Sequence, residues 1–85
     1  MINFKQEELA NELFFTIKKQ FPEIELINYS ESPEDPNDLW INITAPKDED
    51  SEIALIEYAG DKTVDILTAY GYYISIMPRH YIVEA

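Results

Sequence analysis

Residues 38–46, DLWINITAP, alternate apolar and polar side chains and precede a long amphipathic stretch at residues 51–70. Gly71 closes that stretch, and residues 72–77, YYISIM, alternate again. A period of two predicts strands, whereas apolar spacings of three and four predict a helix. Strands joined through a helix lie parallel in one sheet, and the crossover is nearly always right-handed. Residues 38–78 therefore predict one strand–helix–strand unit.

Two further elements precede this unit. Residues 5–20 carry apolar side chains at helical spacing, with Asn3 as a candidate N-cap and Pro22 as a stop. Residues 24–29 alternate as a strand, and the acidic loop at 30–37 leads into the next strand. The expected fold is α/β, of the α+β two-layer kind. Its order is α-β-β-α-β, with a three-stranded mixed sheet and both helices on one face.

The whole chain, residues 1–85, is expected to be a single domain with a core spanning about residues 4–78. Residues 79–85 are interpreted as a tail that frays or adds a short edge strand at 81–83. The sequence has no cysteine, no apparent signal peptide and no apolar run long enough to cross a membrane. These features favour a cytoplasmic protein.

Charge is the strongest compositional signal. Seventeen acidic residues against six basic ones give a net charge of −11, which repels phosphates and anionic lipid headgroups. We therefore expect neither nucleic-acid nor membrane binding, and we expect any protein partner to be basic. Solubility alone is the simpler explanation of the charge, and mimicry of a nucleic acid by an acidic inhibitor is another.

Gly60 lies inside the apolar arc of the expected second helix. Glycine there costs about 1 kcal/mol relative to alanine. We expect close approach of the backbone to the sheet or to the other helix as its cause.

Alternation also assigns each strand residue to a face of the sheet. Apolar residues expected to face the helices are Ile24, Leu26, Leu39, Ile41, Ile43, Tyr72, Ile74 and Ile76. The opposite face is expected to expose Ile27, Tyr29, Trp40, Tyr73 and Met77. A two-layer domain has nothing of its own to cover such a patch, so these five residues are the predicted partner-binding site. The alternatives are that amphipathic aromatics half-cover an open face, or that the tail folds over them.

Catalytic motifs are missing. The sole histidine is His80, there is no cysteine, and Gly60 and Gly71 are too far apart for a phosphate loop. Asp35 and Asp38 are weak candidates for binding a metal, without the spacing of a dedicated site. We expect no catalytic residues and no cofactor.

The order of elements, together with residues 38–46 and 65–77, resembles the minimal nucleotidyltransferase domains that accompany small helical toxins in bacteria. That family carries a Gly-Ser pair, an Asp-x-Asp pair and a third acid, which hold two metals and the nucleotide. Here Tyr29 precedes Ser30 in place of the glycine, and Trp40 stands where the second Asp would follow Asp38. The expected third strand offers no acid, so the resemblance implies a lost two-metal site.

The sequence therefore predicts a small acidic bacterial protein that is antitoxin-like and not an enzyme. We expect it to bind a protein partner, or a second copy of itself, through the open sheet face. The alternatives are a degenerate nucleotidyltransferase-like enzyme using Asp35 and Asp38, or an acidic nucleic-acid-mimic inhibitor.

Overall fold

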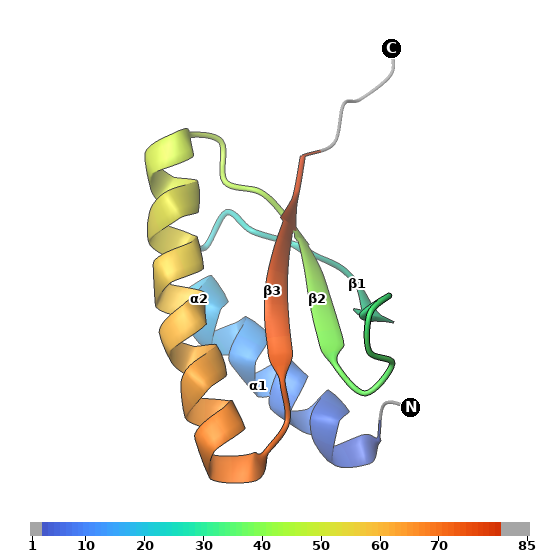
Figure 1. Cartoon of the computed structure of the whole chain (residues 1–85). Coiled ribbons are helices and arrows are strands. Elements are labelled where there is room, and N and C mark those ends of the chain that lie inside the picture. Colours follow the sequence, from blue (N-terminus) through green and yellow to red (C-terminus); the bar gives the residue numbers. More distant parts are fainter. Residues whose placement is uncertain (1–2, 81–85) are drawn as a thin grey trace.

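A computed structural model describes residues 3–80 of the chain (Figure 1). Its five elements follow the predicted order α-β-β-α-β. They are α1 (Phe4–Gln20), β1 (Leu26–Glu31), β2 (Leu39–Thr44), α2 (Glu49–Tyr70) and β3 (Ile74–Arg79). The predicted edge strand at residues 81–83 lies outside the described residues.

Helix α1 begins at the predicted cap. The Asn3 carboxamide oxygen accepts a hydrogen bond from the Gln6 backbone N–H at 2.8 Å, and the Gln6 side-chain oxygen accepts one from the Asn3 N–H at 2.9 Å. This reciprocal pair satisfies two amides that the first helical turn leaves without partners. The helix ends at Gln20, just before Phe21 and Pro22, as predicted.

Helix α2 begins earlier than predicted, at Glu49 instead of residue 51. Its cap is Asp48, whose carboxylate accepts a hydrogen bond from the Ser51 backbone N–H at 3.0 Å. At the other end, Gly71 has a φ of 78° in the left-handed region. This confirms the predicted glycine stop, because a residue with a side chain is strained in that conformation.

The sheet has the order β1-β2-β3, with β1 antiparallel and β3 parallel to β2. The third strand starts two residues later than predicted, at Ile74, and continues through Pro78, its predicted end, to Arg79. Proline is tolerated there because β3 is an edge strand and its outer side makes no ladder.

An irregularity in β1 changes which side chains face the helices. Leu26 pairs with Ile43 but Asn28 pairs with Asn42, so Ile27 and Asn28 together oppose one residue of β2. Such a bulge shifts the alternation of everything that follows. The predicted face of Tyr29, which follows the bulge, therefore needs correction.

Tyr29 pairs with Ile41 and packs on the core, so its predicted place on the open face is wrong. Leu26 was expected in the core but is 40% exposed. The reason is that α1 packs over β2 and α2 over β3, which leaves β1 thinly covered.

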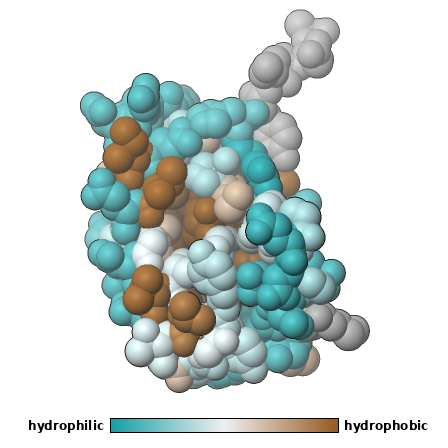
Figure 2. Space-filling model, in the orientation of Figure 1, coloured by the Kyte–Doolittle hydropathy of each residue, from teal (hydrophilic) through white to brown (hydrophobic). Residues whose placement is uncertain are grey.

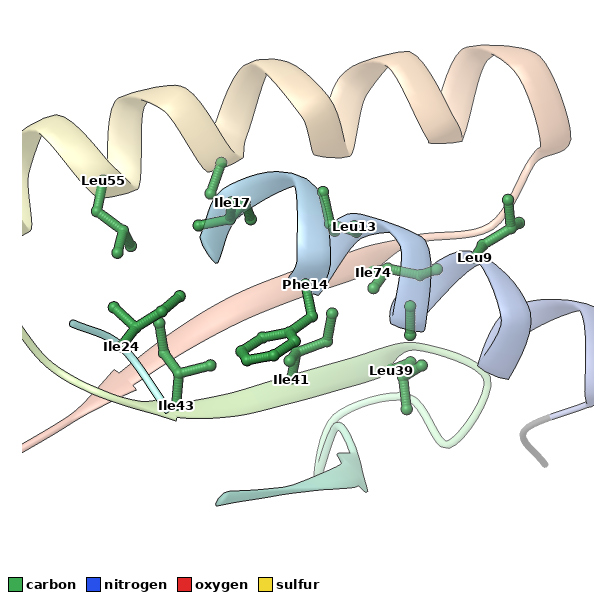
Figure 3. Packing of buried hydrophobic residues seen from close by; sticks show 12 residues of the cluster. Leu9, Leu13, Phe14, Ile17, Ile24, Leu39, Ile41, Ile43, Leu55 and Ile74 are labelled. Atoms are coloured by element: carbon green, nitrogen blue, oxygen red, sulfur yellow. The ribbon is translucent and has the colours of Figure 1, made fainter. Parts of the chain in front are cut away.

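The core lies between the sheet and both helices, which occupy the same side of β2 and β3 (Figure 3). Leu39, Ile41 and Ile43 of β2 are at most 1% exposed. The helices add buried apolar side chains, namely Leu9, Ala10, Leu13, Phe14, Ile17, Leu55 and Ala59. This arrangement confirms the predicted two-layer architecture.

The Asp48 cap makes stability depend on pH. Hydrogen bonds from Ser51 lower the pKa of the Asp48 carboxyl below its ordinary value. A lowered folded-state pKa stabilises the fold fully above the unfolded pKa, about 3.9, and this stabilisation is lost as the pH falls through the folded value. We expect Asp48→Ala to lower the melting temperature at neutral pH, with the difference from wild type shrinking between about pH 4 and pH 2. Thermal unfolding followed by circular dichroism measures it, and a difference that stays constant over this range contradicts it.

Candidate functional site

The sheet face opposite the helices carries a polar network centred on Asn42. The Asn42 amide nitrogen donates to the Asn28 side-chain oxygen at 2.8 Å and to the Ser30 hydroxyl at 2.9 Å. Its oxygen accepts from the Arg79 Nε at 3.0 Å. Asn42 is only 6% exposed although no helix covers this face. Its side chain is therefore satisfied within the chain.

Arg79 also covers Trp40. The guanidinium lies over the indole, 5.5 Å from the ring centre, in cation–π geometry. Trp40 is half-buried as a result. Asn28, Ser30, Asn42 and Arg79 line an open hollow of about 650 Å³ on this face. The face is thus mainly polar, and the expected broad apolar patch on it is not formed.

Of the five residues predicted to bind a partner, Ile27, Trp40 and Met77 lie on the open sheet face, whereas Tyr29 and Tyr73 do not join them. Ile27 lines the polar hollow, and Met77 is half-buried opposite Asn42. Tyr29 lies on the helix side, where its hydroxyl donates a hydrogen bond to the Asn11 side-chain oxygen. Tyr73 precedes β3 and borders α2.

The phenol of Tyr29 lies on the helix side of the sheet, beside α1. Burial, and secondarily the charge of Glu7 on α1, raise the pKa of the Tyr29 phenol. A patch that needs Tyr29 beside Trp40 is therefore excluded, although partner binding by the other residues stays a prediction.

The main exposed apolar surface lies instead on α2. Ile53, Ile56, Val64 and Leu67, here called the α2 stripe, are 43–59% exposed. With Gly60 between them they follow spacings of three and four, so they form one row along the helix. Figure 2 shows apolar side chains gathered over α2 and beside β3. Tyr73, 47% exposed, extends this surface at the start of β3.

A groove runs between the stripe and the edge of the sheet. It has a volume of about 270 Å³ and is bordered by Ile56 and Val64 on α2 and by Tyr73 and Ile76 on the β3 side. Gly60 also lines the groove, and a Cβ atom placed on it would meet nothing within 4 Å. The expectation that Gly60 permits close backbone packing is therefore wrong within the described residues.

The outer edge of β3 is partly blocked. Tyr73 and Arg79 carbonyls accept hydrogen bonds from β2 and from the residue after it, so the backbone groups of Ile74, Ile76 and Pro78 point outward. The Thr63 hydroxyl donates to the Ile74 carbonyl at 2.8 Å, and Pro78 has no N–H. Two of the six outward backbone groups of these three residues are therefore unavailable to another strand, and only Ile76 keeps both of its own.

The sequence did contain a signal for the α2 stripe. Apolar residues occupy roughly half of the circumference of the helix predicted at residues 51–70. The sheet and the neighbouring helix α1 can cover less than half of that circumference. Only Leu55, Ala59 and Thr63 are fully buried in α2. The apolar residues of α2 that neither the sheet nor α1 covers form the exposed stripe.

The candidate metal-binding residues lie in the loop before β2. The Asp35 carboxylate accepts a hydrogen bond from the Asn37 backbone N–H at 3.0 Å. Burial, and secondarily the charge of Asp35, raise the pKa of Asp38. Among residues 3–80 no group of three or more acidic, histidine or cysteine side chains is placed to hold a metal ion. His80, expected to be a solvated tail residue, is exposed and contacts the Glu52 carboxylate at 2.8 Å.

No protein-family model, curated protein or solved structure matches the chain. The resemblance to nucleotidyltransferase domains therefore stays a prediction. In the part of the chain that the structure describes, neither helix is both long and apolar enough to cross a membrane.

Thr63 provides a test of the blocked edge. Thr63→Val keeps the shape but removes the hydroxyl that pairs with the Ile74 carbonyl. Leaving a buried carbonyl without a donor should lower the free energy of unfolding by about 1–3 kcal/mol. Chemical denaturation measures the loss, and Thr63→Ser, which keeps the hydroxyl, is the control. If Val and Ser variants are equally stable, the hydroxyl does not protect this edge.

Proposed function

We propose that the chain is a protein-interaction domain without catalytic activity of its own, and that its contact surface is the α2 stripe with the groove beside β3. The observation that carries this proposal is a continuous row of half-exposed aliphatic side chains next to a hollow. Single exposed apolar residues are ordinary, whereas large contiguous apolar patches and apolar grooves mark contact sites.

The position of Gly60 in the middle of α2 supports the proposal that this surface binds a partner. Glycine in the middle of a helix destabilises it relative to alanine, and no internal contact requires glycine at this position. A residue that breaks a local rule without an internal cause points to a functional requirement. A partner seated in the groove supplies that requirement, because a side chain at residue 60 would extend into the space it occupies.

The open sheet face supports a contact less well. Asn42, Arg79 and Trp40 satisfy one another there. A partner would have to replace hydrogen bonds that these side chains already make with one another. Exchanging one hydrogen bond for another contributes little to the free energy of binding. The side chains of the α2 stripe are aliphatic, so a partner seated there has no side-chain hydrogen bond to displace.

Photo-crosslinking from three positions distinguishes these surfaces. A benzoylphenylalanine is placed at Ile56 on the stripe, at Trp40 on the open sheet face, and at the exposed Phe15 of α1 as control. We expect adducts, with a partner or a second copy, from position 56 alone, resolved by electrophoresis and mass spectrometry. Adducts from position 40 but not from position 56 would contradict the proposal and show that the partner binds the open sheet face.

Substitution of Gly60 should separate stability from binding. Gly60→Ala is expected to raise the free energy of unfolding by about 0.5–1 kcal/mol, because alanine restricts the unfolded chain and a Cβ meets no atom. The same change, and more strongly Gly60→Trp, should reduce crosslinking from position 56. Gly71→Ala is the control, since its positive φ makes it destabilising. Undiminished crosslinking in Gly60→Trp would show that the groove is not occupied.

A further inference from the structure

Glu57 and Asp61 border the α2 stripe on the side away from β3, and Asp65 continues their row toward α1, where it lines a hollow with Lys62. Glu57, Asp61 and Asp65 follow one another at intervals of four residues, so they lie in a row along the helix. All three are exposed, and within residues 3–80 none of them is in an ion pair. Lys62 makes no ion pair with Glu57 or Asp61, and its ammonium lies over the Tyr58 ring, 5.3 Å from the centre.

This row has no stabilising role in the isolated domain. Like charges four residues apart on a helix repel each other and weaken it. Glu57 is the acid nearest the stripe, since it lies on almost the same side of the helix as Val64. The arrangement therefore combines an apolar surface with an uncompensated negative border, and basic side chains complement it.

A second copy of the chain fits this surface poorly. If two stripes packed against each other around a two-fold axis with antiparallel helices, each acidic row would face the other. Both copies also carry a net charge of −11. Like charges brought together at an interface oppose association. An anionic membrane surface is disfavoured for the same reason.

The blocked edge of β3 indicates the conformation of the occupant. Strand addition needs a run of free backbone donors and acceptors. Here the Ile74 carbonyl is already bonded to Thr63, and Pro78 has no N–H to donate. Ile76 alone of the three outward-facing residues keeps both its N–H and its C=O for a new strand, which disfavours strand addition, whereas a helix laid along a groove binds through side chains. The stripe spans residues 53–67, about 21 Å along the helix axis.

We infer that the groove between α2 and β3 binds an amphipathic helix of about four turns, with apolar residues on one face and Lys or Arg beside them. This inference rests on the proposed function. The apolar face fills the groove over Gly60, and the basic side chains contact Glu57 and Asp61. The charged border sets the partner class and its orientation, while the stripe supplies the apolar contact area.

Model peptides test the inference with the whole chain. The probes are three 15-residue peptides: an amphipathic helix of leucine and alanine with lysine borders, the same helix with glutamate borders, and a lysine peptide of scrambled order. Binding is followed by amide shifts of the ¹⁵N-labelled protein. We expect the amphipathic lysine peptide alone to shift amides of residues 53–67 and 73–76, with affinity falling as salt is raised.

Charge reversal provides the matched control. Glu57→Lys with Asp61→Lys should weaken binding of the lysine peptide about tenfold or more and admit the glutamate peptide. Glu31→Lys with Glu34→Lys changes the net charge equally but lies in and just after β1, away from the groove, and should have far less effect. Circular dichroism confirms that both variants keep their helices.

Three results would overturn the inference. Equal binding of the lysine and glutamate peptides removes the charge argument, and a wild-type dimer in sedimentation with the same amides shifted makes a second copy the occupant. Both leave the α2 stripe as the contact surface. Peptide-induced shifts confined to Asn28, Ser30 and Asn42 would instead overturn both the inference and the proposed function.

Discussion

Burial of Leu39, Ile41 and Ile43 beneath two helices is the constraint on which the structure depends. Strands lie about 4.8 Å apart, so the outer backbones of three strands are about 10 Å apart. Two helices packed side by side span about 20 Å. Two helices on one face of this sheet cannot both be centred over it. Because α1 packs over β2, α2 lies over the β3 edge and leaves part of its apolar arc uncovered.

The two faces of the sheet are completed in different ways. The inner face is closed by apolar packing, whereas the outer face is closed by hydrogen bonds of Asn42 and by Arg79 over Trp40. A buried amide with all its partners present is stable, and stripping one partner away leaves an unsatisfied polar group. The polar groups of the outer sheet face therefore find their partners within the chain, whereas the apolar side chains of the α2 stripe stay exposed.

Most of the fold could be predicted from the chain itself because local signals agree with one another. Asn3 marks the start of α1, Gly71 marks the end of α2, and the alternation around Ile41 marks β2. Each local signal agrees with the element that the structure forms there. The predicted binding site was less successful. It assumed unbroken alternation through residues 24–29, and the bulge at Ile27 and Asn28 moves Tyr29 to the opposite face. A bulge is defined by pairing with a neighbouring strand, and no residue within the six residues of β1 predicts it.

The amino-acid sequence alone determined the order of elements, the parallel pairing of β2 and β3 and the strongly acidic character. These depend on periodicity, connection length and composition, which are properties of neighbouring residues. Tertiary structure decided which half of the α2 arc is covered, which side of the sheet receives Tyr29 and how Arg79 reaches Asn42 and Trp40. Each of these depends on contacts between residues far apart in the chain, and such contacts exist only once the layers have packed.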